Sequence, residues 1–329
     1  MSTRSLGILI LLLLLGINTI TFSQVINNTA SFSNINSDNY FRIYYDNDYF
    51  TATDQYYTQG INIEFVHPAL KKFPVSKILL RKRNSSVKYG LAIEHNAYTP
   101  TSIGHNDILY GDRPFAGCLM IKTFAISIDS VKQQRLSSAF SAGVIGPYAF
   151  AENMQRSIHR WIGDVQPMGW QNQIQNDVIL NYELGYEKKL FGYRNTFLLS
   201  LNGAVRLGTL SDKGSAGFTF LFGSFSSPFS DKSLPERSWF AKNFDLYIYG
   251  QPQIVVIGYD ATLQGGLFNS NSPYTIPSSD INRVTIQNNF GIVIGIKKIY
   301  LEYYQSILSK EFSTGTFHRW GGVRVGVSF

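Results

Sequence analysis

Three polar clusters in the sequence carry side chains that could take part in hydrolysis. The first is the run Asp46-Asn47-Asp48, in which three consecutive side chains offer oxygen atoms. The second contains Thr58, which is expected to enter a strand on the same face as Asn62 and Glu64. The third contains Gln155 and His159. Carboxylate and amide oxygens are the ligands of a hard cation such as Ca²⁺. A neutral histidine can take a proton from water as a general base.

Together these groups could hydrolyse an ester, because a cation would stabilise the oxyanion while His159 activates water. Each cluster also has an ordinary structural interpretation. The run of Asp and Asn could be a turn or a solvated loop, and the segment around Thr58 could be a loop. His159 could cap its own helix, whose last turn favours a cation. The spacing of these residues alone leaves both the catalytic and the structural interpretation open.

Other catalytic and binding motifs are missing from the sequence. It contains no Gly-x-Ser-x-Gly nucleophile motif, no His/Cys zinc spacing and no phosphate-binding glycine loop. It also contains no nucleic-acid-binding module, so no nucleic-acid partner is predicted.

A short helix must position the third cluster. Residues 151–163 place Met154, Ile158 and Trp161 at helical spacing, and Gly163 stands where a residue would end the helix. The side chains of Gln155 and His159 are four residues apart and therefore share one face.

The composition points to export and to a membrane. The chain has 329 residues with a formal net charge of +7, and only 16% are charged, against about 25% in a typical soluble domain. Residues 1–24 combine Arg4, an apolar run and a polar end, which is the order of a secretory signal peptide. One cysteine, Cys118, excludes an intramolecular disulfide.

The last residues read as a lipid-facing strand. In residues 317–329, Val323, Val325 and Val327 alternate with polar or small side chains such as Arg324. Apolar residues facing outward and polar residues facing inward are typical of a transmembrane β-barrel. The same alternation recurs along the chain, with charges on the inward face: Glu64, Glu183, Glu187, Arg206, Glu302 and Arg324. A soluble antiparallel sandwich also alternates, but inward charges favour a polar lumen over a dry core.

Turn signals divide the chain into strands of one domain, residues 25–329. Short turns are expected at 192–195 and at Lys297-Lys298. Long loops on the opposite rim are expected at three polar stretches: 208–216, 225–240 and 268–281. The predicted fold class is therefore all-β, a transmembrane antiparallel β-barrel with a short helix in a loop.

Six blocks of residues occur in the order found in a known family: Asn47-Asp48, Asp54 to Gly60, Gly111-Asp-Arg-Pro-Phe115, Val144-Ile-Gly-Pro147, Gln155 to Gly163, and Gly169-Trp-Gln-Asn-Gln173. On these blocks the chain resembles the outer-membrane lipid A 3′-O-deacylases, the LpxR family. The blocks span residues 46–176, and the second half of the chain matches only as a generic barrel.

The resemblance implies a barrel of about 12 strands, with the active site between its wall and the loop helix. It implies calcium-dependent hydrolysis of the 3′-acyloxyacyl ester of lipid A. From their places in the family motif, Asp48 would bind the cation and Asn47 would belong to the site. Thr58 would donate or accept a hydrogen bond, Gln155 would position water or substrate, and His159 would be the base.

One departure concerns the phosphates of lipid A. The family loop before Gly-Asp-Arg carries a basic pair, whereas the stretch from Thr99 to Tyr110 has no Lys or Arg. Arg113, Arg156 and Arg160 could supply the cations instead, because guanidinium groups suit phosphate.

The resemblance also implies a place and partners. The expected location is the outer membrane of a Gram-negative bacterium, with the site toward the outer leaflet. The expected partners are lipid A in lipopolysaccharide and the surrounding membrane lipids, and the chain is expected to be a monomer. Two alternatives stay open: a phospholipase or other lipid esterase on the same scaffold, and a non-catalytic pore or structural barrel.

Overall fold

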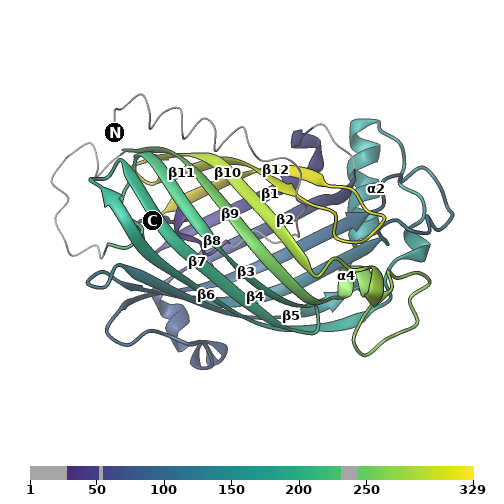
Figure 1. The fold of residues 1–329 in the computed structure, drawn as a ribbon, viewed down its shortest axis with the longest axis horizontal. Helices are drawn as coiled ribbons and strands as arrows, with labels where there is room; N and C mark the ends of the chain where they lie inside the picture. The colour runs from purple at the N-terminus through teal and green to yellow at the C-terminus, as the bar shows by residue number, and fades with distance from the viewer. Residues whose placement is uncertain (1–27, 52–54, 231–243) are drawn as a thin grey trace.

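Twelve antiparallel strands form one closed barrel (Figure 1). The structure is a computed structural model that describes residues 28–51, 55–230 and 244–329. Each strand pairs with its neighbours in sequence, and β1 pairs with β12 to close the cylinder. The strands are β1 Tyr40–Asn47, β2 Tyr56–Val66, β3 Ser86–Thr99, β4 Ala116–Asp129, β5 Gln134–Ile145, β6 Asp177–Tyr193, β7 Phe197–Gly208, β8 Ser211–Ser224, β9 Phe244–Asp260, β10 Val284–Ile296, β11 Ile299–Leu308 and β12 His318–Ser328. The predicted all-β barrel is confirmed, and the predicted signal peptide, residues 1–24, lies outside the described residues.

Helices are few and short. The α-helices of the described ranges are α2, Ala151–Ile162, and α4, Ala261–Gln264. None of the helices in these ranges is long and apolar enough to cross a membrane. Single turns of 3-10 helix complete the chain: η1 Ser31–Ser33, η2 Asp48–Thr51, η3 Pro68–Lys72, η4 Pro74–Lys77, η5 Pro147–Ala149, η6 Trp170–Asn172 and η7 Ser278–Asp280.

The strands carry apolar side chains outside and polar ones inside, as predicted. On β12, Val325 and Val327 are exposed, whereas Arg324 is buried and pairs with Glu302 at 2.6 Å. Further apolar side chains exposed on the outer wall are Ile43, Ile63, Ile93, Ile121, Val205, Ile254 and Leu301. Soluble proteins carry the opposite pattern, with apolar side chains inside. The arrangement seen here is stable only where lipid surrounds the wall.

The two rims differ in their connections. At the rim where β12 ends, here called the C-terminal rim, strands are joined by short turns at 194–196 and 297–298. The turns predicted at 192–195 and at Lys297-Lys298 are therefore confirmed, the first shifted by one or two residues. The opposite rim, here called the loop rim, carries the predicted long connection between α4 and β10.

Two of the predicted loops are wrong. Strands β7 and β8 are separated only by Thr209 and Leu210, because the small polar residues of the predicted loop 208–216 continue the strands. Asp212 Oδ1 accepts a hydrogen bond from the backbone of Gly208 and holds this tight turn. Of the loop predicted at 225–240, residues 225–230 lie at the C-terminal rim and not at the loop rim, since β8 runs toward the C-terminal rim, and the rest lies outside the described residues.

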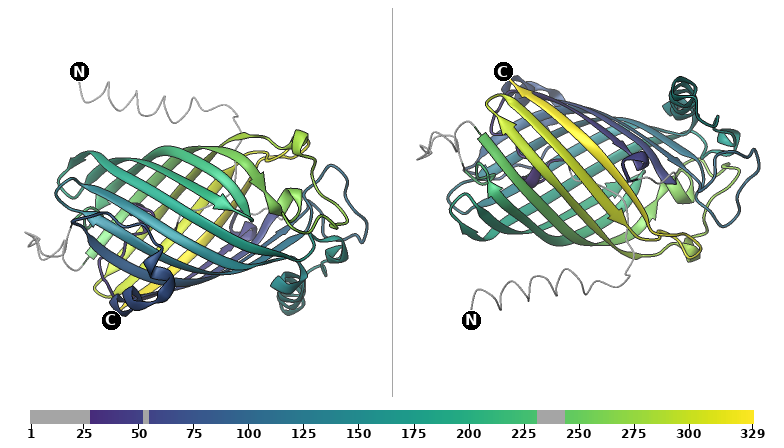
Figure 2. Two further views of the ribbon diagram at one scale, coloured as in Figure 1. Left: turned by 90° about the horizontal axis from the view of Figure 1, so that it is seen from below. Right: turned by 90° about the horizontal axis from the view of Figure 1, so that it is seen from above.

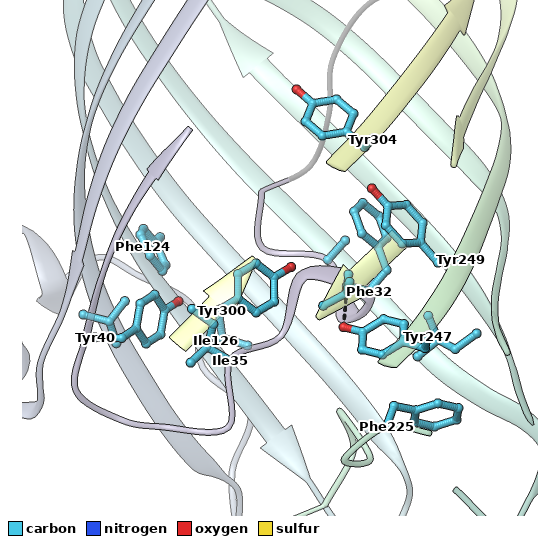
Figure 3. Packing of buried hydrophobic residues seen from close by; sticks show 14 of the residues in the cluster. Phe32, Ile35, Tyr40, Phe124, Ile126, Phe225, Tyr247, Tyr249, Tyr300 and Tyr304 are labelled. Atoms are coloured by element: carbon cyan, nitrogen blue, oxygen red, sulfur yellow. Dashed lines mark hydrogen bonds between the residues drawn. The ribbon is translucent and has the colours of Figure 1, made fainter. Parts of the chain in front are cut away.

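The N-terminal segment fills the barrel at the C-terminal rim. Residues 28–35 lie inside the cylinder and residues 36–39 lead out to β1 at the rim. Phe32 is fully buried and stacks on Tyr249 at 4.2 Å between ring centroids (Figure 3). The hydroxyl of Tyr247 donates to the carbonyl of Phe32 at 2.7 Å, and Arg42 donates to the carbonyl of Ser33 at 2.6 Å. We call residues 28–35 the plug.

An ion-paired chamber lies beyond the plug. Lys122 lies 2.8 Å from Glu94 and 3.3 Å from Glu183, and Arg206 lies 3.1 Å from the same Glu183. These groups line a cavity inside the barrel. The lumen is therefore a chamber in which acidic and basic side chains pair with one another. The plug obstructs this chamber at the C-terminal rim.

Candidate active site

Helix α2 lies outside the barrel at the loop rim (Figure 2). The helix approaches the wall closely at Gly117 on β4, since a Cβ at this position would stand 2.6 Å from the Cβ of Ala151. On β3, Nε2 of His95 lies 3.0 Å from the carbonyl oxygen of Ala149, just before the helix. His95 follows Glu94, which faces the lumen, so alternation directs His95 outward. The helix thus covers the outer face of the wall.

The predicted helix and its predicted face are both present. Gly163 adopts a left-handed conformation, φ 74°, and ends the helix. The buried positions are Ala151, Gln155 and His159, spaced four residues apart. The wall therefore contacts the face that carries the two functional candidates.

A β-bulge brings Thr58 to the helix. The register of β2 against β3 shifts between Tyr57 and Gln59, so Thr58 is an extra residue on its strand. The prediction that Thr58 shares the inward face of Asn62 is therefore wrong, because the bulge breaks the alternation. Tyr57 takes the inward position instead, where its hydroxyl donates to Asn96 at 3.0 Å.

Gln155 joins the helix to the wall. Its Nε2 donates to Oγ1 of Thr58 at 3.2 Å, and its Oε1 accepts a hydrogen bond from Nε1 of Trp170 at 2.7 Å. An indole N–H can only donate, so the orientation of the amide is determined. Trp170 is fully buried and packs on Phe115, with 4.9 Å between ring centroids. Sequence reasoning assigned no role to Trp170, although it lies in the last of the six blocks.

Asn47 completes the contact from the end of β1. Its Nδ2 donates to the backbone carbonyl of Thr58 at 2.6 Å, and its Oδ1 accepts from the backbone of Tyr49 at 2.7 Å. Asp48 follows as the first residue of η2 and is 3% exposed. Its Oδ2 accepts a hydrogen bond from the backbone of Gln55 at 2.7 Å. The structure therefore brings Asn47, Thr58 and Gln155 into one network, with Asp48 adjacent in sequence.

His159 is held in one tautomer. Its Nδ1 lies 2.7 Å from the carbonyl oxygen of Val165, which can only accept. Nδ1 therefore carries the proton of the neutral ring, and Nε2 keeps its lone pair. The carboxylate of Asp164 lies 3.9 Å from Nδ1. A neutral imidazole in this orientation can act as a base through Nε2.

The donor set suits a hard cation only in part. Within the described ranges, no group of three or more His, Cys, Asp or Glu could hold a metal ion. Asp48 is a buried carboxylate beside an amide, and Asp54 lies outside the described residues. Calcium accepts backbone carbonyls, amides and waters besides carboxylates, so Asp48 fits as one ligand of such a set.

The three arginines predicted to bind phosphate are not brought together. Arg113 is 1% exposed, and its terminal nitrogens donate to Glu311 and to Thr262 Oγ1. This buried ion pair joins the loops of the rim and keeps the guanidinium of Arg113 away from the surface. Arg156 and Arg160 lie on the outer side of α2, where Arg156 pairs with Glu152 at 3.2 Å.

Apolar side chains stand exposed beside the network. Trp161 is 87% exposed, and Ile162 and Val165 are more than half exposed. They follow His159 at the end of α2, on the outer side of the barrel. A large exposed apolar group of this kind is typical of a surface that contacts lipid or another apolar partner.

The chain is similar to a known protein family and to solved barrel structures. The family model described as "Outer membrane protein LpxR" matches residues 9–329. The solved structure of LpxR from Salmonella typhimurium is similar, with a TM-score of 0.70 and 19% identity over 88% of this chain and 100% of that one. The β domain of the Bordetella autotransporter BrkA has a TM-score of 0.45 and 8% identity over 89% of this chain and 99% of that one. No curated protein sequence matches significantly.

Proposed function

The chain belongs to the LpxR family of outer-membrane proteins, and from this membership we propose that it is a lipid A deacylase that hydrolyses the 3′-acyloxyacyl ester. One observation carries the proposal: the hydrogen bond from Gln155 to Thr58 holds the face of α2 that bears His159 against the wall. A buried helical face with a base and an amide, fixed on a barrel wall, has no evident purpose in a pore.

The position of the site fits a substrate that stays in the membrane. Helix α2 covers the outer face of the wall, so the ester of a lipid in the outer leaflet can reach the network from the side. Its acyl chains would remain among the lipids, next to the exposed Trp161 and Ile162. Entry from the side avoids moving apolar chains through water, which would be costly.

Water attack would be driven by His159. Its Nε2 takes a proton from water while the oxygen attacks the carbonyl carbon of the 3′ ester, and the resulting tetrahedral intermediate expels the 3′ alkoxide oxygen of the sugar. The proton held by the imidazole then passes to that oxygen, so the products are the free acyloxyacyl fatty acid and a lipid A 3′-hydroxyl. Val165 keeps the ring in its reactive tautomer through Nδ1.

The oxyanion needs donors or a cation. The amide of Gln155 is oriented by Trp170 and Thr58 and would position water or substrate. Calcium, when bound through Asp48, would supply positive charge to the developing oxyanion. Asn47 would fix the backbone of Thr58 and the start of η2 around it.

The headgroup contacts differ from the expectation based on three arginines. Arg160 is exposed on α2 and Arg156 pairs with Glu152 of the same helix near the surface, whereas Arg113 has a structural role. We propose that the phosphate nearest the site contacts these two helix residues, since guanidinium groups bind phosphate in a fork.

Mass spectrometry of lipids from cells tests the proposal. Lipid A from cells with the protein should lose one acyloxyacyl chain, and cells with the His159→Ala variant should retain it. The control His67→Gln changes a histidine at the C-terminal rim and should behave as the wild type. Unchanged lipid A with cleaved phospholipids would favour a phospholipase, and no change in either lipid would favour a non-catalytic barrel.

A further inference from the structure

The connection between β2 and β3 is unusual for the C-terminal rim. The other complete connections described at this rim have two to four residues, at 130–133, 194–196 and 297–298, whereas this one runs from 67 to 85. It contains the two turns η3, Pro68–Lys72, and η4, Pro74–Lys77. We call residues 68–83 the strap; it appears in blue below the left end of the barrel (Figure 1).

The strap lies on the outside of the wall. Leu79 is 2% exposed and packs against Tyr89 of β3 and Ala125 of β4. Tyr89 lies between Lys88 and Gly90; Lys88 points inward, where its Nζ donates to the carbonyl of Ile35 in the plug. Alternation therefore places Tyr89 on the outer face, and the strap covers it.

The wall provides polar partners for the strap's backbone. The amide of Leu80 donates to the hydroxyl of Tyr182 at 2.9 Å, and its carbonyl accepts from Oγ of Ser138 at 2.7 Å. The amide of Lys82 donates to Oγ of Ser127 at 3.1 Å. Ser127 and Ser138 are outward positions of β4 and β5, where a lipid-facing wall would otherwise carry apolar side chains. The strap is thus a built part of the outer surface.

The strap carries positive charge without negative charge. Between Glu64 and Glu94 the sequence contains no Asp or Glu. The strap itself contains six basic residues: Lys71, Lys72, Lys77, Arg81, Lys82 and Arg83. All except Lys82 are exposed, and Lys82 pairs with Asp129 at 3.7 Å.

Exposed apolar side chains are interleaved with these charges. Phe73 is 41% exposed, Ile78 is 53% exposed and Leu80 is 54% exposed. A segment that alternates basic and large apolar side chains is suited to the interface between lipid headgroups and acyl chains. Basic residues near a membrane surface attract anionic lipids.

We propose that the strap binds anionic glycerophospholipids of the periplasmic leaflet of the outer membrane. Short turns face the periplasm in outer-membrane barrels, so the C-terminal rim and the strap lie at that leaflet. Lys71, Lys72 and Lys77 contact the lipid phosphates, while Phe73 and Ile78 enter the acyl boundary. The proposal rests on the outer-membrane location of the family and not on the proposed hydrolysis.

Lipid retention by the purified full chain tests the strap. Native mass spectrometry in detergent would compare phosphatidylglycerol with zwitterionic phosphatidylethanolamine. The test variant is Lys71→Gln/Lys72→Gln/Lys77→Gln. The matched control is Arg194→Gln/Lys297→Gln/Lys298→Gln, which removes three exposed charges from the same rim outside the strap.

The wild type and the control should retain phosphatidylglycerol preferentially, and the strap variant should bind it at least about tenfold more weakly. Added salt should weaken retention by the wild type. The strap variant should still fold, as judged by heat-modifiable gel migration, and should release fatty acid from lipid A in detergent at the wild-type rate. Equal retention of the two lipids by the wild type, or equal loss in both variants, would overturn the proposal.

Discussion

The side-chain amide of Gln155 donates to the hydroxyl of Thr58 at 3.2 Å and so joins a helix in a rim loop to the wall of the barrel. The two residues are 97 positions apart in the chain. Their contact depends on a bulge that inserts Thr58 into β2 and on the close approach of α2 at Gly117. The site is therefore a product of tertiary structure at the outer face of the wall.

Removing the amide of Gln155 should slow ester hydrolysis. We expect Gln155→Ala to lower kcat/KM by about 10²-fold, the usual cost of a lost hydrogen-bonding group that orients or stabilises the reacting atoms. Asn153→Ala, on the exposed side of the same helix, should leave the rate unchanged. Fatty acid release from lipid A in detergent micelles measures both variants. Equal rates for the two would show that Gln155 has no part in the reaction.

Trp170 should act by orienting Gln155. Trp170→Phe keeps an aromatic ring against Phe115 but removes the N–H that Gln155 Oε1 accepts. One hydrogen bond of about 1 kcal/mol corresponds to roughly a fivefold change, so we expect a loss of that order in kcat with little change in KM. Heat-modifiable migration checks that the barrel remains folded. A rate equal to that of the wild type would show that the hydrogen bond from Trp170 to Gln155 has no part in the reaction.

Activity should depend on a divalent cation bound through Asp48. Chelation should abolish fatty acid release, and Ca²⁺ should restore it. Asp48→Asn removes the charge but keeps the size, so it should raise the Ca²⁺ concentration required for half-maximal rate by at least about tenfold. Titration of the rate with Ca²⁺ measures this shift. Full activity in the presence of chelator would contradict a role for the cation.

The plug should prevent ion conduction. The wild type should show no channel in a planar bilayer, because Phe32 and its neighbours fill the lumen at the C-terminal rim. Removal of residues 28–35 should open a conducting path through the polar chamber. Stable single-channel conductance by the wild type would instead favour the pore.

Much of the fold could be predicted from the sequence because a barrel wall is a regular pattern. Alternation along β12 gives the correct outward and inward faces of Val325 and Arg324, and two of the short turns lie where polar residues mark them. The loop predictions failed where polar residues belong to strands. The small polar residues after Gly208 belong to strands, so the loop predicted there does not exist.

The site could be predicted only in part, for a physical reason. Helical spacing correctly places Gln155 and His159 on one buried face. A bulge leaves no signature in the alternation of β2, so the position of Thr58 was assigned to the wrong face. Arg113 looked like a phosphate ligand because its partner Glu311 lies 198 residues away in sequence.

The most direct test of the account is the rate of fatty acid release from purified lipid A by the His159→Gln variant. Glutamine can still donate a hydrogen bond toward Val165 but has no basic nitrogen to take a proton from water. We predict a rate at least about 10²-fold below that of the wild type, in a protein whose heat-modifiable migration is unchanged. A folded variant that releases fatty acid at the wild-type rate would contradict it.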